Sequence, residues 1–171
     1  VTVTGSTGTG RRIMECAAQT LKKVFLELGG KSANIVLDDA DFAAVLPMAA
    51  MTCVHGGQGC AITTRILIPR SRYDEALGTL KTAFENWSYG DPTDAANLQG
   101  PQISHRQRER VLAYIEKGKA EGARCLVGGG APTGKLGEKG YFVEPTLCPL
   151  YTYDAADALT RIRVRSHRTR F

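Results

Sequence analysis

The sequence predicts an α/β fold in which helices pack against a parallel sheet. Short runs of β-branched and aliphatic residues alternate with stretches of helical periodicity, a pattern typical of parallel α/β sheets. Hydrophobic residues make up 43% and charged residues 23% of the chain, which excludes a wholly disordered protein. No apolar run approaches the roughly 20 residues that span a bilayer, and no basic and then apolar leader opens the chain. We therefore expect a cytoplasmic protein without a membrane partner.

The first third of the chain predicts three strands and one helix. Valines and threonines at residues 1–4 favour an extended backbone. The glycine-rich residues 5–10 then predict a tight turn, and helical composition follows over residues 11–21. The next two strands are expected at residues 23–28 and 34–37, because each is a short apolar run ended by glycine or aspartate.

The middle of the chain becomes helical over residues 40–54, with Asp39 or Asp41 available to cap the first turn. Three glycines among residues 55–60 exclude a regular element there, and residues 65–68 then form a strand that a proline ends. The remaining predicted elements are amphipathic helices at 73–87 and 104–118, the second capped by Ser104, a strand at 124–127 and a loop up to residue 140.

The cysteines and histidines are spaced too widely to predict a disulfide framework or a metal site. The five cysteines form no Cys-x-x-Cys pair, and the three histidines are also far apart in sequence. We therefore expect no metal, and only Cys60 is a candidate nucleophile. The other four lie in apolar or ordinary surroundings that favour an inert thiol: Cys16, Cys53, Cys125 and Cys148.

Cys60 lies in the segment GGQGCA at residues 56–61. Its small neighbours leave room for a carbonyl group to approach the sulfur, and nearby backbone N–H groups can stabilise an oxyanion. Glu27 is a second candidate, because a carboxylate buried between Leu26 and Leu28 would suit a general base. Strand alternation alone instead predicts that Glu27 faces solvent while the two leucines face inward.

The glycine-rich turn at residues 5–10 can present backbone amides and a helix N-terminus to a phosphate. Its spacing is G-x-x-G-x-G rather than the dinucleotide fingerprint G-x-G-x-x-G, and no lysine follows as a P-loop requires. By itself, the pattern favours an ordinary strand-to-helix turn.

Positive charge is concentrated at the end of the chain. The formal net charge is +5, and five arginines fall within residues 161–171, so the remaining chain is close to neutral. An arginine run can contact nucleic-acid phosphates, which makes a non-enzymatic nucleic-acid binder one alternative. No recognition fold is visible there and a solvated end is the commoner outcome, so we expect no nucleic-acid partner.

Four segments, taken in order over about residues 1–147, together resemble the aldehyde dehydrogenase family. Two of them carry the candidate base and the candidate nucleophile, 33 positions apart, and this combination is highly specific for the family. VTGST at 3–7, with Gly10, is similar to the family's strand and turn beside the cofactor pyrophosphate. LELGGKS at 26–32 is similar to its glutamate signature, and GQGC at 57–60 is similar to its cysteine signature. GYFVEPT at 140–146 is similar to the segment before a further cofactor-contacting motif.

The resemblance implies an enzyme that oxidises a small aldehyde to a carboxylic acid with NAD or NADP. It makes Cys60 the nucleophile that carries a thiohemiacetal and then a thioester, and it makes Glu27 the general base. Strand alternation alone favours a solvent-facing Glu27 without a role, and the resemblance reverses that preference. The positions implied near the cofactor are Gly5 and Ser6 beside the dinucleotide and Leu28 and Gly29 beside the nicotinamide.

The implied fold is the parallel-sheet αβα catalytic domain of the aldehyde dehydrogenase type, preceded by the last part of the dinucleotide-binding domain. We expect that domain edge at residues 1–28, an incomplete thiol-bearing catalytic domain at 29–147, and a basic tail at 148–171 that is out-of-frame or disordered, since it lacks the family's Glu-x-Phe-Gly-Pro motif. The chain is then a fragment truncated at both ends, with little or no activity alone. Full-length relatives are homo-oligomers, and the oligomeric state of this chain is left open.

A cysteine-dependent hydrolase or acyltransferase without nicotinamide is the other alternative. Such an enzyme needs an imidazole base, and His55 lies five residues before Cys60. Nothing in the sequence specifies the third, orienting group. Loss of ester cleavage in a His55→Ala variant would favour this hydrolase over the dehydrogenase.

Overall fold

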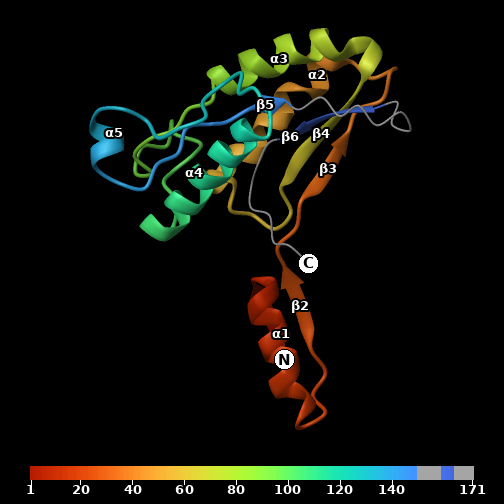
Figure 1. Ribbon diagram of the computed structural model, residues 1–171, viewed down its shortest axis with the longest axis vertical. Coiled ribbons are helices and arrows are strands. Elements are labelled where there is room, and N and C mark those ends of the chain that lie inside the picture. Colours follow the sequence, from red (N-terminus) through yellow and green to blue (C-terminus); the bar gives the residue numbers. More distant parts are fainter. Residues whose placement is uncertain (150–158, 164–171) are drawn as a thin grey trace.

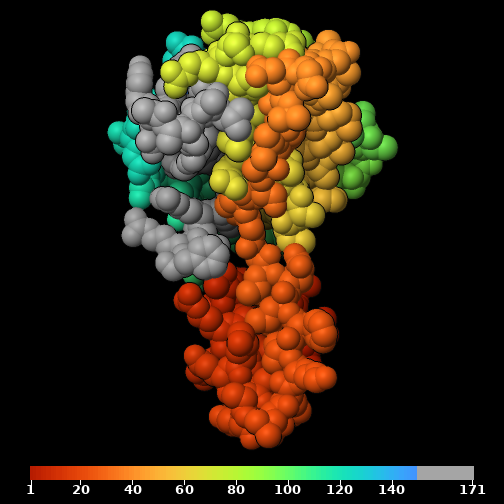
Figure 2. Space-filling model, turned by 90° about the vertical axis from the view of Figure 1, so that its right-hand side faces the viewer, coloured from red at the N-terminus to blue at the C-terminus, as the bar shows by residue number. Residues whose placement is uncertain are grey.

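The computed structural model describes residues 1–149 and the strand Leu159–Arg163, and its N-terminal part projects from a larger body (Figure 1). The projecting unit comprises β1 (Thr2–Gly5), α1 (Thr7–Ala18) and β2 (Phe25–Leu28), with the two strands paired in parallel. Figure 2 shows a narrow waist between this unit and the body. The helical crossover between two parallel strands agrees with the α/β prediction.

α1 begins at Thr7, four residues earlier than predicted, because Ser6 caps it. The Ser6 Oγ accepts a hydrogen bond from the Thr9 N–H at 3.2 Å. The expected turn at residues 5–10 is therefore mostly the first turn of a helix. Gly10 is required where α1 packs on β2, since a Cβ there would lie 2.8 Å from the Leu28 Cδ1.

The body contains a four-stranded sheet in the order β3–β4–β6–β5. β3 (Ser32–Ile35) and β4 (Thr63–Pro69) are parallel, whereas β6 (Leu159–Arg163) runs antiparallel to both β4 and β5 (Cys148–Pro149). The predicted parallel pairing is therefore confirmed for β3 with β4 and wrong for the rest of this sheet. β3 also begins two residues before the predicted strand at 34–37.

β6 lies within the expected basic tail. Its sequence, LTRIR, alternates arginines with other residues, and the arginine-rich composition of this segment led to the expectation of a tail rather than a strand. The other residues of that tail beyond β5, at 150–158 and 164–171, lie outside the described residues. The predicted origin of the tail stays a hypothesis.

The core of the body lies on one face of β4. Thr64, Ile66 and Ile68 alternate inward along the strand, as a period of two residues requires. Packed around this core are α2 (Phe42–Val45), the 3₁₀ helix η1 (Pro47–Gly57) and α3 (Tyr73–Glu85) (Figure 1). The largest fully buried apolar side chains are Phe42, Leu46, Ile66, Ile68, Leu80, Phe84 and Leu147.

The single helix predicted at residues 40–54 is divided in two at Pro47. Proline lacks the N–H that would continue the α-helical hydrogen bonding, so α2 ends at Val45 and η1 follows as a 3₁₀ helix. Of the two candidate caps, Asp41 is the one used. Its Oδ1 accepts hydrogen bonds from the N–H groups of Ala43 and Ala44 at 3.0 and 3.3 Å.

The two long helices after β4 agree with the prediction. They are α3 and α4 (His105–Ala120), and Ser104 caps α4 by accepting a hydrogen bond from the Gln107 N–H at 3.2 Å. Two short helices, η2 (Arg70–Arg72) and α5 (Lys135–Glu138), occur in addition. In the part of the chain that the structure describes, no helix has the length and apolar character to cross a membrane.

The strand predicted at residues 124–127 is wrong. Val127 forms only one isolated antiparallel bridge, with Leu147. The reason is Gly128, whose φ of +60° turns the chain out of an extended conformation directly after the bridge. A local apolar run therefore did not become a strand.

Cys125 and Cys148 form a disulfide, contrary to the expectation of inert thiols. The pair is separated by 23 positions in sequence, and the Val127–Leu147 bridge between the two segments brings it together. The spacing of the cysteines in sequence could not predict this pairing, because the pairing depends on a tertiary contact. The remaining cysteines, Cys16, Cys53 and Cys60, are free.

Two glycine-to-alanine substitutions should change stability in opposite directions. An added Cβ at Gly128 would collide with the Pro145 carbonyl oxygen, so Gly128→Ala should lower the free energy of unfolding by about 2–4 kcal/mol. Gly78 lies inside α3 with open space around it, so Gly78→Ala should raise that free energy by up to ~1 kcal/mol. Urea unfolding followed by circular dichroism measures both, and shifts of the same sign would contradict the structure.

Reduction of the Cys125–Cys148 disulfide should lower the free energy of unfolding by about 3 kcal/mol, because the crosslink restricts the unfolded chain over a sequence separation of 23. Thermal unfolding with and without dithiothreitol measures this effect. A Cys125→Ser/Cys148→Ser double variant is the control and should not respond to the reductant. A wild-type midpoint that is unchanged by reduction would contradict the pairing.

Candidate active site

The segments that carry Glu27 and Cys60 meet where β3 and β4 begin. Parallel pairing sets Ser32 opposite Thr63, so the residues just before the two strands lie side by side. A Cβ added to Gly30 would lie 3.8 Å from the Cys60 carbonyl oxygen. Figure 1 shows this junction below β3 and β4, beyond the carboxyl end of β2.

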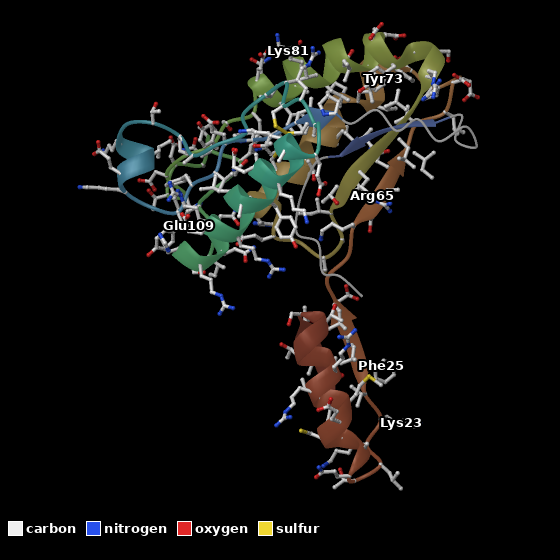
Figure 3. All side chains as sticks on the ribbon, viewed as in Figure 1. Lys23, Phe25, Arg65, Tyr73, Lys81 and Glu109 are labelled. Atoms are coloured by element: carbon white, nitrogen blue, oxygen red, sulfur yellow. A yellow bond between two sulfur atoms is a disulfide. The ribbon has the colours of Figure 1, made fainter. Side chains whose placement is uncertain are left out.

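Glu27 is exposed on the open face of the β1–β2 pair. Leu26 and Leu28 are half-buried against α1, whereas Phe25 and Glu27 are exposed, and Figure 3 shows Phe25 on the side of β2 away from the helix. The solvent-facing orientation predicted from alternation is therefore confirmed, and the burial of Glu27 between Leu26 and Leu28 that would suit a general base is wrong. Glu27 precedes Gly30 by three residues, which span at most about 11 Å of extended chain, and its side chain is exposed.

Cys60 is an exposed free thiol in the turn between η1 and β4. Gly59 allows this turn, since a Cβ at that position would lie 2.8 Å from the Ile62 Cδ1. Among the hydrogen bonds described for residues 1–149, none uses the Cys60 N–H, so this group is available to an oxyanion beside the sulfur. The arrangement allows nucleophilic addition to a carbonyl group.

Cys53 differs chemically from Cys60 although both belong to the same segment of chain. Burial raises the pKa of the Cys53 thiol to about 12 from an ordinary value of 9.0, and a hydrogen bond with the Thr146 backbone opposes the shift only in part. The thiol therefore stays protonated at neutral pH and is a poor nucleophile.

His55 is exposed and does not form the pair that the hydrolase alternative needs. Its backbone has a φ of +54°, and its carbonyl accepts a hydrogen bond from the Gln58 Nε2 at 2.7 Å. Within residues 1–149, no hydrogen bond between the His55 imidazole and the Cys60 sulfur is described. No observation therefore favours the hydrolase.

The start of α1 fits a cofactor phosphate. Gly5 ends β1 opposite Leu28, and Ser6 caps the helix that follows. The first turn contains no acidic residue, and a Cβ added to Gly8 would meet only the Ser6 Oγ, at 3.9 Å. Since a helix N-terminus carries partial positive charge, these residues suit a dinucleotide pyrophosphate. Gly29 follows directly on the neighbouring strand, β2.

Positive charge lies beside the junction. Burial, and secondly the charge of Arg110 on α4, lower the pKa of Lys31. The Arg65 Nε, on β4, donates a hydrogen bond of 2.7 Å to the Lys31 carbonyl (Figure 3). This bond ties the segment after Gly30 to β4, and the cations favour anionic groups nearby.

Two glutamines that the sequence analysis missed attach the cysteine segment to the chain before α4. The Gln102 Nε2 donates a hydrogen bond of 2.8 Å to the Gly56 carbonyl. The Ile103 N–H donates one of 3.0 Å to the Gln58 Oε1. The partners are 46 and 45 positions apart, so no local pattern could have indicated them.

A cleft of about 40 Å³ lies under the same segment, between η1, α4 and residues 143–146. Its lining includes Cys53, Gln99 and Gln102. Ligand pockets usually measure roughly 300–1,000 Å³, so this cleft is too small to be an aldehyde site and belongs to the support of the cysteine segment.

Residues 1–156 match the aldehyde dehydrogenase family. Similar proteins include aldehyde dehydrogenase family 2 member C4 of Arabidopsis thaliana, 43% identical over 156 residues, and a betaine aldehyde dehydrogenase of Rhizobium johnstonii, 45% identical over 163 residues. The alignments cover 90% and 95% of this chain but 30% and 33% of those proteins, so the chain spans about a third of their length. The family match extends beyond residue 147, where the resemblance was expected to end.

Solved aldehyde dehydrogenases share the described fold. An NAD⁺ complex of the Mycobacterium tuberculosis enzyme matches with a TM-score of 0.81 and 49% identity over 86% of this chain and 30% of that chain. A mutant aldehyde dehydrogenase C of Pseudomonas syringae, in complex with NAD⁺ and octanal, matches with a TM-score of 0.80 and 36% identity over the same fractions. The mixed α/β arrangement with parallel strands is therefore common to these proteins and this chain.

Alkylation should distinguish the three free cysteines. Near neutral pH, iodoacetamide should modify the exposed Cys60 and Cys16 and should leave the buried Cys53 unmodified until denaturant is added. Peptide mass spectrometry measures the extent of modification at each position. Rapid modification of Cys53 in the native chain would contradict the structure.

Stability should fall as the pH rises above about 9. The folded chain holds the Cys53 proton up to a pKa of about 12, whereas the unfolded chain releases it near 9.0, so only the unfolded state gains from losing the proton in this range. A Cys53→Ala variant should show a weaker decline of the unfolding midpoint between pH 8 and pH 10. Identical pH profiles for the two proteins would argue against the raised pKa.

Proposed function

The chain belongs to the aldehyde dehydrogenase family, and we propose that it supplies the nucleophile and the general base for the oxidation of an aldehyde to a carboxylic acid. The observation that supports this most directly is the approach of Gly30 to the Cys60 carbonyl, which joins the glutamate and cysteine segments at one junction. In the complete reaction, an aldehyde, an oxidised nicotinamide cofactor and water give an acid, the reduced cofactor and a proton.

The first step is the addition of the Cys60 thiolate to the aldehyde carbon. A C–S bond forms, and the electron pair of the carbonyl bond moves to oxygen. The Cys60 N–H, which makes none of the backbone hydrogen bonds described for residues 1–149, donates to this oxygen. Glu27 takes the thiol proton, directly or through water. The product is a tetrahedral thiohemiacetal on Cys60.

NAD or NADP, when bound, would accept hydride from the tetrahedral carbon, and the oxygen's electron pair would re-form the carbonyl bond of a thioester on Cys60. In this proposal Gly5 and Ser6 would hold the dinucleotide at the start of α1, and Leu28 and Gly29 would border the nicotinamide at the end of β2. The open first turn of α1 supports that assignment, and solved relatives contain NAD⁺.

Glu27 releases the thiol proton to solvent, which is the proton that the net reaction yields, and its carboxylate then activates the water that hydrolyses the thioester. Its carboxylate accepts a proton from water, the hydroxide oxygen bonds to the thioester carbon, and the C–S bond breaks to return the Cys60 thiolate. The exposure of Glu27 on the open face of β2 supports this role, because water reaches it without opening the fold.

We assign residues 1–28 to the edge of a dinucleotide-binding domain and residues 29–147 to the thiol-bearing, αβα catalytic domain. The change from the β1–β2 sheet to the β3–β4–β6–β5 sheet after residue 28 supports this division. The substrate class is a small aldehyde, as the family implies.

Acyl transfer tests the two residues in the chain as it stands. p-Nitrophenyl acetate should acetylate Cys60 with release of p-nitrophenolate, and Cys60→Ala should lose this adduct. In Glu27→Gln the acetyl group should persist on Cys60 roughly 100-fold longer, since a general base contributes at least about that factor. Mass spectrometry of the Cys60 peptide over time measures both effects.

Glu15→Gln is the matched control, because Glu15 is an exposed carboxylate on the neighbouring α1. Its acetyl-Cys60 lifetime should equal that of the wild type. Equal acetyl-Cys60 lifetimes in the wild type and Glu27→Gln would contradict the role of Glu27 as general base. Equal acetylation of Cys16 and Cys60 would contradict the role of Cys60 as nucleophile.

A further inference from the structure

The loop that carries Cys60 has little backbone support of its own. His55, Gly56 and Gly57 have successive φ values of +54°, +63° and +73°, a left-handed run that ends the helix and that His55 adopts only at a cost. Residues 59–61 make none of the described backbone–backbone hydrogen bonds outside helices and strands. Something other than secondary structure must therefore hold the loop.

Two hydrogen bonds with the segment before α4 supply that support. The Gln102 Nε2 donates to the Gly56 carbonyl at 2.8 Å, and the Gln58 Oε1 accepts from the Ile103 N–H at 3.0 Å. The Gln102 backbone is in turn anchored, because its N–H donates to the Tyr141 carbonyl at 2.9 Å. Two attachments thus connect the loop to a segment that is itself fixed.

The contact with Gly56 is close and specific. A Cβ added to Gly56 would lie only 2.5 Å from the Gln102 Nε2, so the amide packs directly on the loop backbone. Gln102 is 4% exposed, and its Oε1 has no described partner. A buried amide oxygen left without a partner costs stability, so the bond from the Nε2 to Gly56 is the hydrogen bond described for this side chain.

We infer that Gln102 is a positioning residue for the Cys60 nucleophile, an inference that rests on the proposed function. Its hydrogen bond to Gly56 holds the loop four residues before the sulfur, and the Gln58–Ile103 bond holds it two residues before the sulfur. Together these bonds keep the sulfur and its own N–H in one arrangement, which addition to a carbonyl requires.

Gln99 provides a matched control from the same cleft. It is 3% exposed, its Nε2 also donates a hydrogen bond of 2.8 Å to a backbone carbonyl, and its Oε1 also lacks a described partner. The difference is the acceptor, which is Val143 rather than the cysteine loop. Gln99→Met and Gln102→Met therefore remove hydrogen bonds of equal length from two buried glutamines, and only Gln102 contacts the loop.

The experiment measures the alkylation rate of Cys60 relative to that of Cys16 in the same molecule. The ratio should fall roughly fivefold in Gln102→Met, about what one net hydrogen bond is worth, and should stay at the wild-type value in Gln99→Met. Exchange of the Gln58 amide, whose N–H donates a hydrogen bond to the His55 carbonyl, should accelerate in Gln102→Met alone. The two variants should lose similar amounts of thermal stability.

Each other result counts against the inference. An unchanged or raised Cys60 to Cys16 ratio in Gln102→Met, or an equal fall in Gln99→Met, would overturn it. If Gln102→Met unfolds, which free alkylation of Cys53 would reveal, Gln58→Ala supplies the same readout by removing the second attachment. A wild-type Cys60 that reacts no faster than Cys16 would instead overturn the proposed function itself.

Discussion

The parallel pairing of β3 with β4 is the constraint on which the candidate site depends. Glu27 and Cys60 lie before different strands and 33 positions apart, and neither segment has a direct hydrogen bond to the other among those described. The ladder that sets Ser32 opposite Thr63 brings Gly30 against the Cys60 carbonyl. The buried side of β4, packed under α3 and η1, holds that register in place.

The surroundings of each cysteine decide its chemistry. Cys53 and Cys60 are seven positions apart, yet burial in η1 keeps Cys53 protonated while the turn before β4 leaves Cys60 exposed. The paired Cys125 has no free thiol. The glycines before Cys60 permit the left-handed backbone that ends η1, and the exposed turn that carries Cys60 follows.

The same glycines increase the conformational freedom of the loop, and contacts with the rest of the fold reduce it. A loop without regular hydrogen bonds is free to adopt many conformations, and a nucleophile on such a loop is poorly placed. Hydrogen bonds to a distant segment restrict this freedom, one made by the buried Gln102 and one by Gln58 of the loop itself. The small cleft beneath these two connections is lined by residues of η1, α4 and the chain at 143–146.

The sequence by itself determined the features that depend on neighbouring residues: the α/β class, α3 and α4, the Ser104 cap, and the motif that singles out Glu27 and Cys60. Tertiary structure alone decided the antiparallel β6, the Cys125–Cys148 disulfide, the single bridge at Val127 and the hydrogen bond from Gln102. The physical reason is distance along the chain. Propensity, capping and turn chemistry act over a few residues, whereas strand direction, burial and side-chain attachments depend on partners dozens of positions away.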